Sequence, residues 1–275
     1  MFLEIMLRVF RGKKAQQQFD KAIGHALADA KRGDVNRTIR QIKETWAISN
    51  KYGLRFTQRE ATYIRDIAYK RGLENSVTFA TSSASQGDVP AAMNFLNCAR
   101  HYASELGISV DEENIGLIVA DAYRNGTEKQ LEWASHELEQ GLPVQAIRAL
   151  RTAQNYASRA GLDINQKAGI MEHQIAAKGV ELYLKLAREE AERGITQSAL
   201  ELLRRAKKFS RFIGADLTQP AQEIERIAYG NQVSRLKRVA ENYRSDGYNN
   251  RAMVWEGLAQ KTATKAGVTL DHIVK

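Results

Sequence analysis

Hydrophobic and small residues in this chain follow a helical spacing, and no segment alternates apolar and polar residues as a strand does. In residues 195 to 213, the apolar positions fall on one side of a helix and the basic positions fall largely on the other. The apolar side is formed by Leu200, Leu203, Ala206, Phe209 and Ile213. The pattern predicts an all-α protein.

Glycines divide the chain into units of equal length. One set recurs every 53 or 54 residues, and each member is followed 20 residues later by another glycine. The first set is Gly33, Gly87, Gly141, Gly194 and Gly247, and the second set is Gly53, Gly107, Gly161, Gly214 and Gly267. A fixed interval held through five copies indicates a structural unit repeated five times, as in a stacked array.

Small residues recur at three positions relative to the first glycine of each unit. They stand seven residues before it, five after it and twelve after it, and the last two lie two helical turns apart on one face. A larger side chain there would force neighbouring helices apart. The predicted packing alanines are Ala26, Ala80, Ala134, Ala187, Ala240, Ala92, Ala146, Ala199, Ala252, Ala99, Ala153, Ala206 and Ala259, with Thr38 and Thr45 at the two later positions of the first unit.

The segment from Gly87 to Ala92, continued by Leu96 and Ala99, resembles the second half of a tetratricopeptide (TPR) repeat. The segments that begin at Gly141 and Gly194 resemble it too. The period differs, because the family's unit has about 34 residues, and the family's usual tryptophan and first glycine are missing. The resemblance implies stacked helical hairpins whose concave surface binds other proteins.

The number of helices per unit has two interpretations. Each second glycine is followed by an apolar residue, which is typical of a helix that ends in the left-handed conformation. Residues 57–60 and 109–112 read as capping boxes, and residues 218–220 place a proline in a first turn. Gly72, Gly126 and Gly179 then recur fifteen residues before the next turn glycine. Either a third helix separates these marks, which we favour, or a long kinked helix pairs with a short one.

The predicted fold is an α-solenoid of about five TPR-like repeats with two or three helices each. Residues 1–32 would form an N-terminal cap with the first helix of repeat 1, residues 33–267 the array, and residues 268–275 a tail. The apolar start is interpreted as a capping helix, with an interfacial anchor helped by neighbouring lysines and arginines as the alternative. No stretch approaches 18 consecutive apolar residues, so no membrane span is expected.

Cysteine content points to a reducing compartment. Cys98 is the sole cysteine, which excludes an internal disulfide framework and a cysteine-based zinc site. We expect a cytoplasmic protein, in which Cys98 packs in a half-buried place beside Ala99.

The chain has a formal net charge of +9, and its charged residues are distributed unevenly along the sequence. Residues 87 to 140 hold three Lys or Arg against ten Asp or Glu, a net charge of −7, whereas the chain ends are basic. Such asymmetry bears on partners rather than on the fold. One consequence would be a homo-oligomer in which a basic end meets the acidic second repeat of another copy.

Two functions from different classes follow. The first is a scaffold that binds a protein partner, which the resemblance implies. The alternative is RNA or DNA binding through phosphate contacts on the terminal repeats. Its candidate residues are Arg204, Arg205, Lys207, Lys208, Arg211, Arg235, Lys237, Arg238 and Arg244, for which a solvated outer face is the simpler interpretation. Tyr102, Tyr156 and Phe209 share one repeat position, which favours packing over base stacking.

No constellation of catalytic residues is recognisable. The five histidines are scattered without a one-turn pair that would bind a metal from one helix face. Gly12-Lys13-Lys14 lacks the upstream glycine of a phosphate loop. We therefore expect a protein that is not an enzyme and needs no cofactor or metal.

Overall fold

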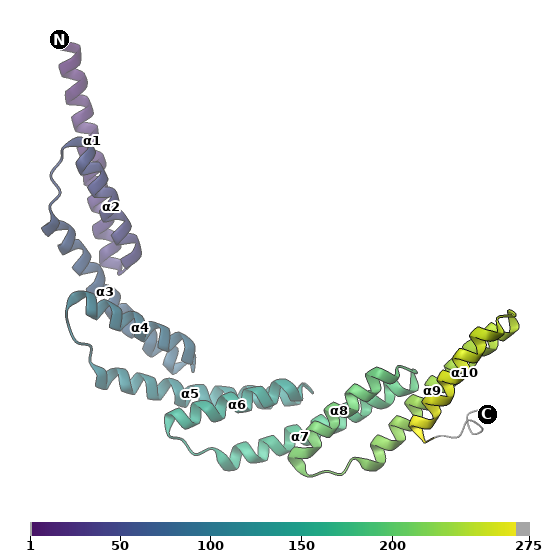
Figure 1. Ribbon diagram of the computed structural model, residues 1–275. Helices are drawn as coiled ribbons and strands as arrows, with labels where there is room; N and C mark the ends of the chain where they lie inside the picture. The colour runs from purple at the N-terminus through teal and green to yellow at the C-terminus, as the bar shows by residue number, and fades with distance from the viewer. Residues whose placement is uncertain (1, 268–275) are drawn as a thin grey trace. The chain divides into compact units, whose positions relative to one another are not determined.

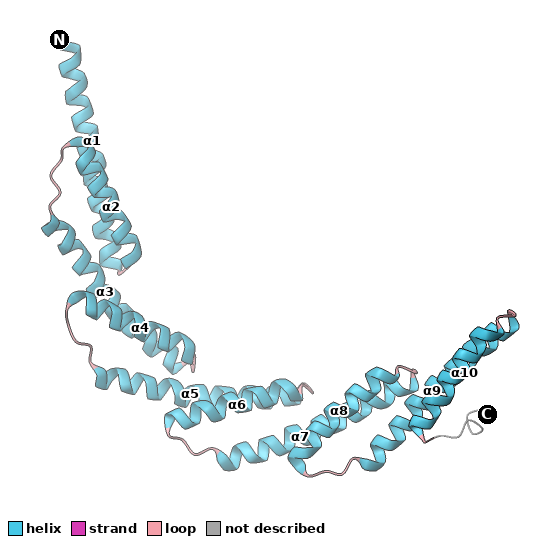
Figure 2. Ribbon diagram, viewed as in Figure 1, coloured by secondary structure: helices cyan, strands magenta, loops and turns pink. Residues whose placement is uncertain are grey.

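The computed structural model describes residues 2–267, with side chains for residues 12–265 and 267, and shows ten helices and no strand in that range (Figures 1 and 2). Long helices alternate with short ones. The long helices are α1 (Phe2–Arg32), α3 (Gln58–Ser85), α5 (Glu112–Glu139), α7 (Asn165–Glu192) and α9 (Thr218–Ser245). The short helices are α2 (Val35–Tyr52), α4 (Val89–Leu106), α6 (Pro143–Ala160), α8 (Thr196–Ile213) and α10 (Asn249–Ala266). The predicted tail, 268–275, lies outside the described residues.

Each repeat period yields two helices, so the favoured three-helix interpretation is wrong. Gly72, Gly126 and Gly179 lie inside uninterrupted helices of 28 residues. A Cβ atom on Gly126 would lie 2.6 Å from Val89 Cγ2 and 3.1 Å from the ring of Tyr156. These glycines therefore leave space into which side chains of neighbouring short helices pack, and they do not end a helix.

The glycines that mark the repeat are the ten residues with positive φ in the described chain, at 61° to 83°. Five of them follow the long helices, and the other five end the short helices. Gly53, for example, has φ of 65° and donates its backbone N–H to the carbonyl of Ser49. Glycine suits this left-handed conformation because a Cβ atom there is strained.

Helix starts agree in part with the predicted caps. Thr57 and Glu60 form the predicted capping box at α3: the Thr57 hydroxyl accepts from the Glu60 N–H, and the Glu60 carboxylate accepts from the Thr57 N–H. The capping box predicted at 109–112 is wrong. Asp111 caps α5 instead, because its carboxylate accepts from the Asn114 N–H at 3.1 Å.

The chain divides into two compact units, Met1–Lys129 with Tyr156–Leu162 and Gln130–Asn155 with Asp163–Lys275. In the first unit, α1 packs against α2 and α3, and α3 packs against α4. In the second, α7 packs against α8 and α9, and α9 packs against α10. Each unit therefore repeats one pattern, in which a long helix contacts its short partner and the next long helix.

Small residues lie where helices approach one another. All thirteen alanines at the three repeat positions have at most 2% of their surface exposed. Thr38 and Thr45 are also buried, and their hydroxyls donate to the carbonyls of Asp34 and Gln41 one turn earlier in the same helix. Threonine is tolerated there because its hydroxyl is satisfied without a partner from another helix.

Amide side chains connect consecutive long helices. Asn75 donates to the carbonyl of Arg32, Asn125 to that of Ala84, and Asn231 to that of Ala191, at 2.8 to 3.0 Å. Each acceptor lies in the last turn of the preceding long helix, where carbonyls lack an intrahelical donor. These bonds fix the C-terminus of one long helix against the middle of the next.

Acid should weaken the start of α3 through Glu60. The hydrogen bonds from the Thr57 backbone and then from its hydroxyl hold the pKa of Glu60 below its ordinary value. The stabilisation is therefore present above the unfolded pKa and is lost as the pH falls through the folded pKa. We expect the difference in melting temperature between the wild type and Glu60→Gln to shrink as the pH falls from about 7 to about 3.

Thermal unfolding followed by circular dichroism measures this difference. Glu44→Gln, a change at an exposed glutamate within α2, is the matched control. If the difference in melting temperature between the wild type and Glu60→Gln did not change with pH, the role given to the Glu60 carboxylate would be contradicted.

Candidate binding surface

A groove of about 430 Å³ lies between α6 and α8, wholly within the second unit. It is lined by Val144, Ile147, Arg148 and Arg151 from α6, by Arg205, Lys208, Phe209 and Phe212 from α8, and by Tyr183 from α7. The five apolar and aromatic side chains are called the floor below. The groove combines an apolar floor with four cationic side chains, which is the composition of a surface that binds a partner with both apolar and negative groups.

Three of the four cations have no carboxylate within ion-pair distance among the described residues. These are Arg148, Arg151 and Lys208, each of which is unpaired although exposed carboxylates are common elsewhere on the surface. The fourth, Arg205, lies 3.7 Å from Glu201 and 5.9 Å from the ring centre of Tyr183. The groove therefore holds positive charge that the chain itself does not neutralise.

The floor is held by the core of the second unit. Tyr183 and Phe209 are buried and stacked on one another, with ring centres 5.7 Å apart and planes at 21°. Phe209 also covers Gly179, where a Cβ atom would lie 2.7 Å from the ring. Phe212, one turn further along α8, is 43% exposed. The floor therefore includes two buried, mutually packed rings and an exposed apolar ring, Phe212, at the opening of the groove.

Sequence reasoning named Arg205 and Lys208 but missed Arg148 and Arg151. The repeat spacing was the signal that could have indicated them. Arg148 and Arg151 follow Gly141 by seven and ten residues, and Arg205 and Lys208 follow Gly194 by eleven and fourteen residues. The structure brings these two sets of positions to one groove.

The other predicted basic residues do not join this groove. Arg204 pairs with Glu201 at 3.6 Å, Lys207 pairs with Glu225 at 3.4 Å, and Arg244 pairs with Glu256. Arg211 lines a separate hollow beside Asp216 and Glu225. Lys237 is half-buried on α9 and has interactions of its own.

Arg235 and Arg238 line a hollow of about 330 Å³ together with Arg193 and Asn231. Glu192 lies in the same hollow. This is a second, smaller gathering of positive charge in the unit, and it lies between the end of α7 and the middle of α9.

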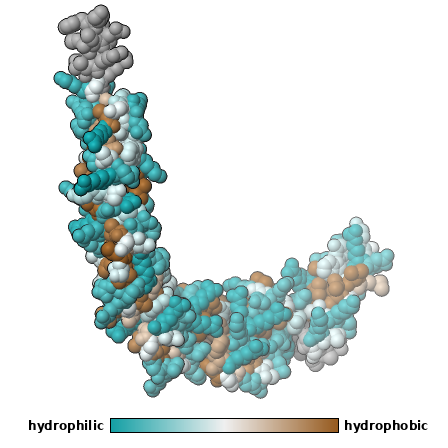
Figure 3. Space-filling model, turned by 60° about the vertical axis from the view of Figure 1, so that its left-hand side comes forward, coloured by the Kyte–Doolittle hydropathy of each residue, from teal (hydrophilic) through white to brown (hydrophobic). Residues whose placement is uncertain are grey.

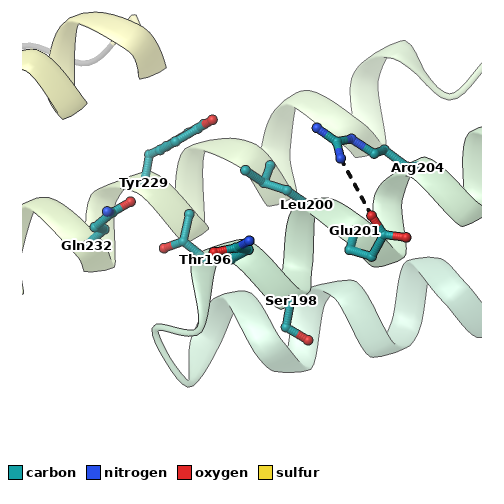
Figure 4. A pocket seen from close by; sticks show the side chains of 8 residues that line it. Thr196, Ser198, Leu200, Glu201, Arg204, Tyr229 and Gln232 are labelled. Carbon is teal, nitrogen blue, oxygen red and sulfur yellow. Dashed lines mark ion pairs between the residues drawn. The ribbon is translucent and has the colours of Figure 1, made fainter.

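A polar pocket of about 510 Å³ lies between α8 and α9 (Figure 4). Thr196, Leu200 and the Glu201–Arg204 ion pair line it from α8, and Tyr229 and Gln232 line it from α9. Gln232 stands where α3, α5 and α7 carry a glycine, and Thr262 stands where α4, α6 and α8 carry an aromatic ring. The last helix pair therefore lacks the glycine–aromatic pair.

The shared aromatic position serves packing. Tyr102 lies 5.8 Å from Tyr69 and Tyr156 lies 5.6 Å from Tyr123, measured between ring centres. Burial raises the pKa of Tyr102 above its ordinary value. These rings occupy the spaces over Gly72 and Gly126 and do not present a face to a base.

Cys98 is exposed on α4, so the expected half-buried packing is wrong. It precedes the buried Ala99 by one residue, about 100° around the helix, which turns it to the surface. In the described part of the chain, no group of three or more His, Cys, Asp or Glu residues could hold a metal ion. Among those residues, no helix is both long and apolar enough to cross a membrane.

Comparison with known proteins gives no match: no family model, curated protein or solved structure resembles the chain closely enough to be assigned.

Proposed function

We propose that this protein is a non-enzymatic α-solenoid of TPR-like repeats that binds a protein partner. The repeat glycines, the buried alanines and the alternation of 28- and 18-residue helices support the repeat architecture. In such arrays each unit packs on its neighbours, and the stacked helices leave an extended surface for binding.

The groove between α6 and α8 is the observation that carries the proposal. Exposed apolar side chains occur elsewhere too, and on the face that Figure 3 shows they form patches among hydrophilic residues. In this groove, apolar side chains lie between unpaired cations on two helices. Apolar anchors ringed by charge are what protein interfaces use.

Nucleic-acid binding is the alternative, and the hollow with Arg193, Arg235 and Arg238 favours it. A chain that binds phosphates should stay on heparin or labelled RNA at low salt and lose affinity steeply as salt rises. We expect weak retention of this kind, because Arg204, Lys207 and Arg244 are already paired with carboxylates. No retention at low salt would reject the alternative.

Site-specific photocrosslinking in cells tests the protein-binding proposal directly. A photoreactive amino acid at Phe212 should give discrete protein adducts, and the same probe at the exposed Lys185 of α7 serves as the matched control. The adducts at position 212 should disappear when Arg148 and Arg151 are changed to glutamate. Adducts to RNA, or no adducts at position 212, would overturn the proposal.

A further inference from the structure

We propose that the groove between α6 and α8 takes an acidic amphipathic segment of a partner protein, in which carboxylates flank apolar side chains. This inference rests on the proposed function and specifies the chemistry of the partner. Its basis is the placement of four cations on two facing walls of one apolar groove.

Comparison of matched repeat positions shows that this composition is special to one pair of short helices. The two positions that supply Arg148 and Arg151 on α6 are Arg40 and Lys43 on α2, asparagines on α4, and Glu201 and Arg204 on α8. The two positions that supply Arg205 and Lys208 on α8 are Cys98 and His101 on α4, and Leu258 and Lys261 on α10. The pairing of α6 with α8 is therefore the one whose four matched positions are all Lys or Arg.

The two walls would hold carboxylates at two levels. Arg148 and Arg151 are three residues apart on α6, and Arg205 and Lys208 are three residues apart on α8, so each wall presents two cations about one turn apart. Arginine binds carboxylates with two parallel hydrogen bonds, which gives geometric selection as well as attraction. A segment with acidic residues on both flanks would meet both walls.

The floor selects against a nucleic acid. The rings of Tyr183 and Phe209 are stacked on one another and buried, so their faces are not open to a base. Single-stranded nucleic acids gain affinity from stacking successive bases on exposed aromatic faces, and here Phe212 is the one lining aromatic ring that is exposed. Val144, Ile147 and Phe212 instead offer contacts to aliphatic side chains.

Binding of a designed peptide tests this inference. The probe is a fluorescent synthetic helix of about 18 residues, the length of α6, with a leucine face flanked by glutamates. A glutamine version of the same peptide is its matched control. We expect the glutamate peptide to bind the full chain at least about tenfold more tightly than the glutamine peptide, with the difference shrinking in high salt.

Variants locate the site. The double variant Arg148→Gln with Arg151→Gln should bind the glutamate peptide about tenfold or more weakly than the wild type. The double variant Lys185→Gln with Arg188→Gln on α7 should bind it with unchanged affinity. Labelled poly-U RNA and a second copy of this chain are tested in parallel. Equal affinity for the two peptides, an unchanged affinity in the α6 variant, or tighter groove-dependent binding of RNA or of a second copy would overturn the inference. Protein adducts at position 212 would still support the proposed function in that case.

Discussion

Replacing Gly87 with alanine should destabilise the chain by about 2 kcal/mol or more. Two costs combine at this turn between α3 and α4. Gly87 has φ of +67°, a conformation in which a Cβ atom costs about 1–2 kcal/mol. That Cβ atom would also lie 2.7 Å from the Asn125 carbonyl oxygen and 2.9 Å from its carbonyl carbon. Because these are backbone atoms within α5, they cannot move aside as a side-chain end can.

Gly107→Ala provides the matched control. Gly107 has nearly the same φ, +68°, but nothing lies within 4 Å of the position that its Cβ atom would take. Its replacement should therefore cost only the conformational term, about 1–2 kcal/mol. Urea unfolding gives the difference in stability, and hydrogen exchange should show faster opening of α3 and α4 in the Gly87 variant. Equal losses in the two variants would show that the close approach to α5 is not a constraint.

Enlarging a buried repeat alanine should cost about 1–3 kcal/mol through overpacking. Ala187 of α7 is fully buried and packs in a cluster with Ala191, Ala199 and Leu203. Ala134 of α5 is equally buried in the main cluster of the second unit. Leucine at either position would push a neighbouring helix away, since the packed interior has no space for three more carbon atoms.

Ala177→Leu separates overpacking from a general effect of leucine in a helix. Ala177 lies in the same helix as Ala187 but is exposed. Its replacement should change the melting temperature little, because a surface leucine displaces no neighbour. Wild-type melting of Ala187→Leu and Ala134→Leu would mean that these positions tolerate larger side chains and that the small-residue pattern does not set helix spacing.

Local features of the chain could be predicted well from its sequence. The ten glycines were recognised by spacing alone, and they are the residues with positive φ because only glycine adopts that conformation without strain. The capping box at Thr57 and Glu60 was predictable for a similar reason, since its hydrogen bonds lie within four residues.

The three-helix prediction failed because a residue can serve a neighbour that is distant in sequence. Gly126 looks like a helix break in a single segment, but it is a buried contact for Val89 and Tyr156. The structural role of Gly126 depends on which side chains of other helices pack against it. Cys98 was misplaced for another reason: one residue before the buried Ala99 is about 100° around α4, which helical spacing alone places away from the packed face.

The sequence by itself determined the repeat length, the turn residues and the small-residue faces, because each depends on backbone conformation or on spacing along one helix. Only the tertiary structure decided that each repeat has two helices and that Arg148 and Arg151 face Arg205 and Lys208 across an apolar floor. The physical reason is that facing walls of a groove arise from the packing of separate helices. Periodicity gives the face on which a residue lies, and packing decides which other face it meets.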